Sequence, residues 1–114
     1  MVKALPSSAL FGKEFVPQAI IDRPLSFFAD KLHLSVFKGH DDLDEYEAAA
    51  VEVGDGMIIE LKHQSGYPND TTTIYLPYGI DDLAKITLVI SVIVQEFGIP
   101  RGWITWQRAD DPSL

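Results

Sequence analysis

Four consecutive residues, Glu60-Leu61-Lys62-His63, place a carboxylate three positions before an imidazole. Carboxylate-bridged metal sites use this spacing because residues i and i+3 share one face of a helix. The surrounding segment 57–63, MIIELKH, has the composition of a β-strand instead. On a strand, an odd separation directs two side chains to opposite faces. The sequence therefore predicts no metal centre at this spacing.

A second candidate for metal binding is the acidic segment 39–56, GHDDLDEYEAAAVEVGDG, which holds seven acids and no Lys or Arg. His40 and the aspartates after it offer imidazole and oxygen ligands. A calcium loop, however, needs regularly spaced oxygen donors, a glycine at its sharp turn and a distant bidentate glutamate. The run HDDLDEYE has no glycine between its acids. We therefore expect a solvated loop that binds no metal.

The excess negative charge of the chain is concentrated around this segment. The formal net charge is −8, from 17 acids and 9 bases. Eight acids lie between Lys38 and Lys62 with no base among them, and the other nine acids are balanced by the nine bases. Such a field disfavours nucleic acid, whose phosphates require Lys and Arg, and it favours a basic protein partner. The acidic surface that we expect to meet this partner consists of Asp41, Asp42, Asp44, Glu45 and Glu47.

The sequence offers no recognisable enzymatic nucleophile. It contains no Cys, which excludes thiolate chemistry, disulfides and cysteine-based zinc or iron–sulfur sites. No serine lies in a nucleophile-elbow motif, and the three histidines are separated along the chain. Gly54-Asp55-Gly56 lies between two predicted strands, where no helix N-terminus is available to bind a phosphate. We expect a non-catalytic protein that uses no cofactor.

The N-terminal residues 1–24 are predicted to form an irregular arm, because Pro6, Pro17 and Pro24 interrupt its short apolar pieces. Residues 25–108 then form a single domain, and 109–114 form a polar tail. At the start of the domain, LSFFADKL has helical spacing of its apolar residues, with Asp22 as a candidate cap. A short helix is the prediction here, and an extended segment is the alternative.

Alternation of apolar and polar residues, β-branched content and turn residues predict about five strands. These lie at 32–38, 45–53, 57–63, 71–77 and 103–108. The second and third are joined as a hairpin by the glycine-bearing turn at 54–56. The first four form a meander in the simplest arrangement, although a rearranged sheet would give the same pattern.

The segment 81–97, DDLAKITLVISVIVQEF, is predicted to be a long apolar C-terminal helix. Asp81 and Asp82 suit the positive end of the helix dipole, and Gly98 followed by Pro100 is a stop signal. The expected fold is therefore α+β, a mostly antiparallel sheet packed on this helix. An apolar helix and an open sheet edge are also compatible with a homodimer.

The aromatic residues suggest an alternative function. Trp103 and Trp106 are three apart in a predicted strand, so they point to opposite faces and only one can serve the core. The other, with Tyr75 and Tyr78, is available for a pocket or an interface. An apolar, aromatic-lined pocket would make the protein a small-molecule binding domain, with weak enzymatic activity as a variant of that reading. A purely structural homodimer is the third reading.

The sequence also predicts where the protein resides. Pro6, Ser7 and Ser8 interrupt the apolar residues near the N-terminus, which disfavours a secretory signal. The longest apolar run, 86–94, is about half of the roughly 20 residues that span a membrane. We expect a cytoplasmic protein that does not bind membranes.

Overall fold

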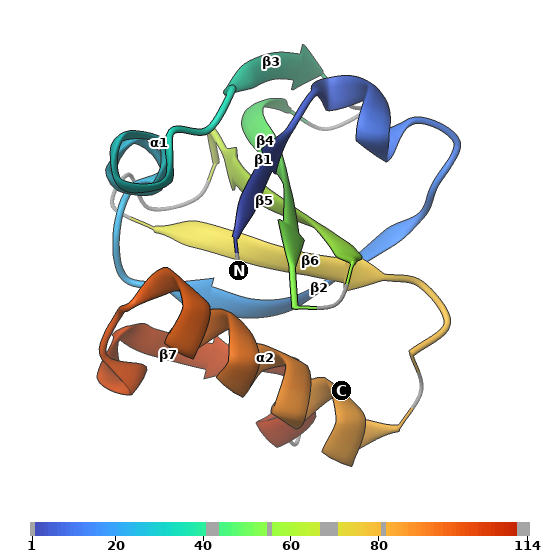
Figure 1. Ribbon diagram of the computed structural model, residues 1–114, viewed down its shortest axis with the longest axis vertical. Coiled ribbons are helices and arrows are strands. Elements are labelled where there is room, and N and C mark those ends of the chain that lie inside the picture. The colour runs from blue at the N-terminus through green and yellow to red at the C-terminus, as the bar shows by residue number, and fades with distance from the viewer. Residues whose placement is uncertain (1, 41–43, 55, 67–70, 81, 112–114) are drawn as a thin grey trace.

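A computed structural model describes residues 2–40, 44–54, 56–66, 71–80 and 82–111. Within these residues the chain forms a seven-stranded antiparallel sheet and two α-helices (Figure 1). The strands are β1 Lys3–Leu5, β2 Phe15–Ile21, β3 Phe37–His40, β4 Glu45–Val53, β5 Met57–Gln64, β6 Thr72–Pro77 and β7 Ile104–Gln107. The helices are α1 Leu25–Leu32 and α2 Leu83–Phe97. Three short 3-10 helices accompany them: η1 Ser7–Leu10, η2 Arg101–Trp103 and η3 Arg108–Asp110.

The strand order is β1-β4-β5-β6-β2-β7, and β3 also pairs with β4. β1 pairs with residues 50–52 of β4 and β3 with residues 45–48, so these two short strands share one edge of the sheet. From β3 to β6 the chain is an antiparallel meander, as the simplest reading of the sequence predicted. β2 enters between β6 and β7 and joins the two halves of the sheet.

The α+β class and the antiparallel sheet are confirmed, but the sheet has seven strands where about five were expected. Both additional strands, β1 and β2, lie in the segment 1–24 that was predicted to be irregular. β2 was not predicted because it contains Pro17, and a proline normally argues against a central strand. Here the register shifts between Pro17 and Ala19, and this bulge accommodates the missing N–H.

The boundaries of two other strands differ from the predicted ones. The strand expected at 32–38 begins only at Phe37. His33 ends α1 in the left-handed conformation, with φ of 55°, and the residues after it form the connection to β3. At the other end of the sheet, Trp103 belongs to η2 and β7 begins at Ile104.

The helix predicted at 81–97 is present as α2, of fifteen residues. Asp82 caps it, since its Oδ1 accepts a hydrogen bond from the Ala84 N–H at 2.9 Å. Gly98 ends it in the left-handed conformation, with φ of 66°. Its buried side chains belong to the core, whereas Leu83 is 57% exposed. Neither of the described helices is long and apolar enough to cross a membrane.

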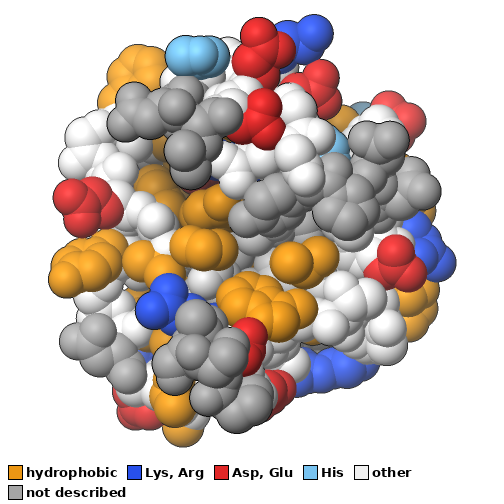
Figure 2. Space-filling view, turned by 180° about the vertical axis from the view of Figure 1, so that it is seen from behind, with side chains coloured by type: hydrophobic (Ala, Val, Ile, Leu, Met, Phe, Trp, Pro, Cys, Tyr) orange, Lys and Arg blue, Asp and Glu red, His pale blue; other side chains and the backbone are white. Residues whose placement is uncertain are grey.

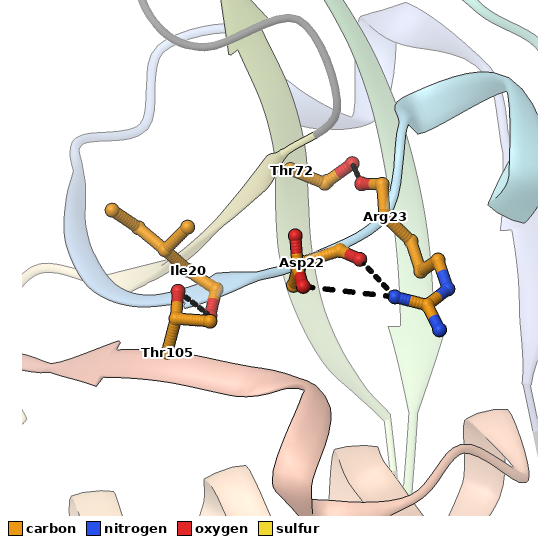
Figure 3. Close-up of polar contacts among 5 residues, drawn as sticks. All are labelled: Ile20, Asp22, Arg23, Thr72 and Thr105. Atoms are coloured by element: carbon orange, nitrogen blue, oxygen red, sulfur yellow. Dashed lines mark hydrogen bonds and ion pairs between the residues drawn. The ribbon is translucent and has the colours of Figure 1, made fainter.

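The junction between β2 and α1 is tied to both of its neighbouring strands (Figure 3). The Thr72 hydroxyl of β6 donates to the Arg23 carbonyl at 2.9 Å, and the Thr105 hydroxyl of β7 donates to the Ile20 carbonyl at 3.5 Å. Asp22 was expected to cap α1, but it does not. Its carboxylate lies 3.8 Å from the Arg23 guanidinium, and Pro24 occupies the cap position.

The two faces of the sheet have different coverings. On one face, α1 and α2 bury an apolar core with strand residues such as Ile21, Leu61 and Ile74. On the opposite face, η1 contacts β4 and β5. η1 lies at the upper right of Figure 1, away from α1. The N-terminal segment therefore supplies a second, smaller layer, and the candidate site lies beneath it.

Candidate functional site

Glu60 and Lys62 lie on the face of β5 that η1 covers. They are two residues apart, so they share this face, whereas Leu61 between them belongs to the core. In the strand register, Glu60 lies opposite Ala50 on β4 and opposite Tyr75 on β6. The alanine is small, and this leaves room above β4 for the longer side chains of β5.

The two side chains form a nearly buried ion pair. The Lys62 Nζ and the Glu60 Oε2 are 3.7 Å apart, and the side chains are 15% and 10% exposed, respectively. The Lys62 ammonium also lies 4.4 Å from the ring centre of Tyr46 and 4.7 Å from that of Tyr75. Tyr46 and Tyr75 occupy diagonal positions on the two neighbouring strands, so the ammonium interacts with an aromatic face from each side.

Burial dominates the electrostatics of this pair. The loss of hydration raises the pKa of the Glu60 carboxyl, although the positive charge of Lys62 opposes the shift. The ion pair therefore does not fully compensate the removal of the carboxylate from water. A buried carboxyl with a raised pKa beside a specific charge partner is a feature of many functional sites.

The pair forms the floor of a pocket of about 320 Å³ between the sheet and the N-terminal segment. The pocket thus combines an ion pair and two further polar side chains with apolar and aromatic ones. Its lining residues are Ser7, Leu10, Phe11, Lys13, Phe15, Phe37, Tyr46, Glu60, Lys62 and Tyr75.

The wall formed by Tyr46 depends on a glycine in the neighbouring strand. Gly39 lies opposite Tyr46 in the β3–β4 pair. A Cβ atom at Gly39 would lie 2.3 Å from Tyr46 Cζ, far inside van der Waals contact. The tyrosine ring therefore occupies the space that any side chain at residue 39 would need.

The four aromatic residues proposed from the sequence are not gathered around this pocket. Tyr75 lines it, whereas Tyr78 is 71% exposed. Trp103 packs edge-on against Phe27 at 5.5 Å between ring centres, beneath the Arg23 guanidinium at 3.7 Å. The Trp106 indole N–H donates to the Asp111 carboxylate at 2.7 Å.

The predicted acidic surface is only partly visible. Asp41 and Asp42 lie outside the described residues. Asp44 accepts hydrogen bonds from the Glu45 N–H at 2.9 Å and from the Gly66 N–H at 2.5 Å, so its carboxylate links the start of β4 to the residues after β5. Glu45 and Glu47 are both exposed on β4.

Basic and histidine residues lie opposite these two glutamates in the sheet. His40 pairs with Glu45, and both Lys38 and His63 pair with Glu47. At the top of Figure 2, acidic side chains accordingly appear together with basic and histidine side chains. The described part of this surface is therefore mixed in charge, and those residues contain no group of three or more His, Asp or Glu that could hold a metal ion.

Glu60 and His63 lie on opposite faces of β5, as their spacing on a strand predicts. Glu60 faces the pocket, whereas the His63 Nδ1 lies 3.0 Å from the Thr71 carbonyl oxygen. The candidate functional pair on this strand is instead Glu60 and Lys62, which was not predicted from the sequence. The even spacing of these two on a predicted strand, opposite Tyr75, was the available signal.

Comparisons of the chain with protein-family models, curated proteins and solved structures found no match.

Replacing Gly39 with Ala is expected to displace Tyr46 and lower the free energy of unfolding by about 1–3 kcal/mol, since the new methyl group overlaps the ring. Urea unfolding measures the loss. Gly102→Ala is the matched control, because a Cβ there meets no atom within 4 Å. Equal stability of the two variants would show that Tyr46 does not pack on β3 in this way.

The raised pKa of Glu60 predicts how stability depends on pH. The folded protein holds the Glu60 proton to higher pH than the unfolded chain, so this residue's contribution to stability falls as pH rises above about 4. Glu60→Gln mimics the protonated form. At pH 7 it should be at least as stable as the native protein, and the difference should shrink toward pH 4.

Lys62→Met is the companion variant. It leaves the buried carboxylate without its countercharge and should lose about 2–4 kcal/mol at pH 7, and less at pH 4. Thermal unfolding across this pH range measures both variants. A large loss of stability in Glu60→Gln at pH 7 would contradict the assigned direction of the pKa shift.

Proposed function

We propose that the protein is a non-catalytic binding domain that holds a small apolar carboxylate in the pocket over β5. The observation that carries the proposal is the position of the Lys62 ammonium between Tyr46 and Tyr75, with Glu60 as its ionic partner at 3.7 Å. An ammonium carries three donors, and a single acceptor at that distance leaves capacity for an incoming anion.

The charges around the pocket favour an anionic ligand. Lys13 lines the pocket together with Lys62, and Glu60 is the only acid among the described residues that line it. Because the pKa of Glu60 is raised, this carboxyl takes up a proton more readily than an exposed glutamate does. Once protonated, it can donate a hydrogen bond to the ligand carboxylate while Lys62 supplies the charge.

The rest of the lining selects an apolar ligand body. Phe15, Phe37 and Leu10 surround the ion pair together with the two tyrosine rings. A volume of about 320 Å³ is at the lower end of the range for small-molecule sites. An aromatic ring or a short aliphatic chain bearing one carboxylate satisfies both the volume and the charge.

The proposal concerns binding and not catalysis. Among the described residues that line the pocket there is Ser7 but no histidine that could activate it.

Phenylacetate is the probe that tests the proposal, with binding followed by calorimetry and by amide chemical shifts. We expect saturable binding, with shifts centred on β5 and the N-terminal segment. Lys62→Met should raise the dissociation constant about 10- to 100-fold, the loss expected for a hydrogen bond to a charged group. Lys85→Met is the matched control, because Lys85 is exposed on α2 and does not line the pocket.

The affinity should also fall as pH rises through the raised pKa of the Glu60 carboxyl, since binding takes up a proton there. Glu60→Gln should bind with little dependence on pH. Absence of binding at millimolar phenylacetate, or equal affinity in the Lys62→Met variant, would contradict the proposal.

A basic protein partner for the β3–β4 edge is a second candidate function. The observation that favours it is the exposure of Glu45 and Glu47 on β4, next to the short edge strand β3. The outer side of such an edge strand offers backbone hydrogen-bonding groups to a strand of a partner. Electrostatic attraction would speed association and make it sensitive to salt.

Capture from a cell lysate at low salt tests this second function. The native protein should retain a basic protein that a salt step releases, and the double variant Glu45→Gln and Glu47→Gln should retain much less of it. Glu14→Gln serves as the control, since Glu14 is exposed far from this edge in the sequence. Equal retention of the basic protein by the native protein and the double variant would contradict binding at the β3–β4 edge.

A further inference from the structure

A second pocket contains a buried polar group whose hydrogen bonding is incomplete. Gln18 on β2 is only 5% exposed. Its Oε1 has no hydrogen-bond partner among the described residues. Buried polar atoms of this kind are rare in native proteins, and each one calls for an explanation such as a bound molecule.

The β-bulge in β2 determines where Gln18 points. Pro17 pairs with Tyr75 and Ala19 pairs with Ile74, so Gln18 is the extra residue between two ladder positions. Bulges of this kind redirect a side chain and occur frequently beside functional sites. The Gln18 amide is thereby placed in the wall of a pocket at the end of the core, next to the start of α2.

This pocket has a volume of about 230 Å³ and is distinct from the one over β5. Arg108 of η3 also lines it. β2 and β7 are antiparallel, and Ala19 pairs with Gln107. Gln18, which precedes Ala19, and Arg108, which follows Gln107, therefore lie at the same end of this strand pair. Gln18 and Arg108 therefore come to one pocket from neighbouring segments.

The remaining walls are mostly apolar. They are formed by Val16, Pro77, Tyr78, Gly79, Ile80, Leu83 and Ile86. The pocket is thus lined by the amide of Gln18, whose Oε1 is buried in the wall, by a guanidinium suited to a carboxylate and by an aliphatic surface. These three features suit a hydrogen-bond donor, a carboxylate and an aliphatic chain, respectively.

We propose that this pocket binds a short aliphatic carboxylic acid that carries a hydrogen-bond donor on the carbon next to the carboxylate. The Gln18 amide turns its Oε1 toward the pocket and accepts a hydrogen bond from the donor. The carboxylate pairs with Arg108, and the aliphatic chain packs on Leu83 and Ile86. A 2-amino acid and a 2-hydroxy acid share this chemistry. The proposal is independent of the phenylacetate site, because it uses different residues and a different face of the sheet.

Three probes of similar shape test the proposal. Valine carries an amino donor, 2-hydroxy-3-methylbutanoate carries a hydroxyl donor, and 3-methylbutanoate carries neither. Each is titrated into isotope-labelled protein, and the side-chain amide signal of Gln18 and the guanidinium signal of Arg108 are followed. At least one of the first two should shift both signals saturably and bind at least tenfold more tightly than 3-methylbutanoate. Whichever of valine and 2-hydroxy-3-methylbutanoate binds more tightly shows whether the donor is an amino group or a hydroxyl group.

Two variants assign the contacts. Arg108→Gln should weaken binding about tenfold or more, whereas Arg101→Gln, which changes another exposed arginine outside the pocket, should not. Gln18→Leu should abolish the preference for probes with a donor. This variant should also have a melting temperature several degrees above that of the native protein, because it removes a buried acceptor that has no hydrogen-bond partner among the described residues. This expected gain in stability ensures that the variant can be assayed as a folded protein.

Several outcomes would overturn the proposal. One is that none of the three probes moves the Gln18 signal, as expected if the pocket holds only water. Others are equal affinity for 3-methylbutanoate, and unchanged preference for donors in Gln18→Leu.

Discussion

A nearly buried ion pair on the less covered face of the sheet determines how this molecule must be built. Glu60 and Lys62 are removed from water at a position where Ile59 and Leu61, on the opposite face of the same strand, belong to the apolar core. Such a pair is tolerated only where its partners lie close and the charges are otherwise stabilised. Tyr46 and Tyr75 supply that stabilisation from the two neighbouring strands.

The N-terminal segment completes this arrangement. β1 extends the edge of β4, η1 contacts β4 and β5 above the pair, and β2 then enters the sheet beside β6. Without these residues, the ion pair and the tyrosine rings would lie on an open sheet surface. The same segment also creates the bulge at Gln18, so both pockets depend on its path.

The elements with local signals could be predicted from the sequence. The hairpin of β4 and β5 follows from alternation around a glycine turn, and α2 follows from its apolar spacing between Asp82 and Gly98. β2 could not be predicted in the same way. Its pairing with β6 joins residues more than fifty positions apart, and Pro17 within it is a local signal against a strand.

The candidate sites show the same limit. Tyr75 was identified as a residue for a pocket, but Trp103 packs on Phe27 from η2, and Trp106 donates to Asp111 from β7. The acids that are close together in the sequence do not form a uniformly negative surface among the described residues, because cross-strand pairing places Lys38 beside Glu47. Gln18 carried no signal, as its burial depends on a bulge formed with β6.

The most direct test of this account is the proton chemical shift of the Lys62 ε-methylene group, measured on the unliganded protein at neutral pH. If the ammonium lies between the faces of Tyr46 and Tyr75, ring currents from both must shift these protons well upfield of their position in an unfolded chain. We predict that shift. A Lys62 signal at the unfolded position would show that the side chain extends into solvent, and the pocket described over β5 would then lack its defining charge.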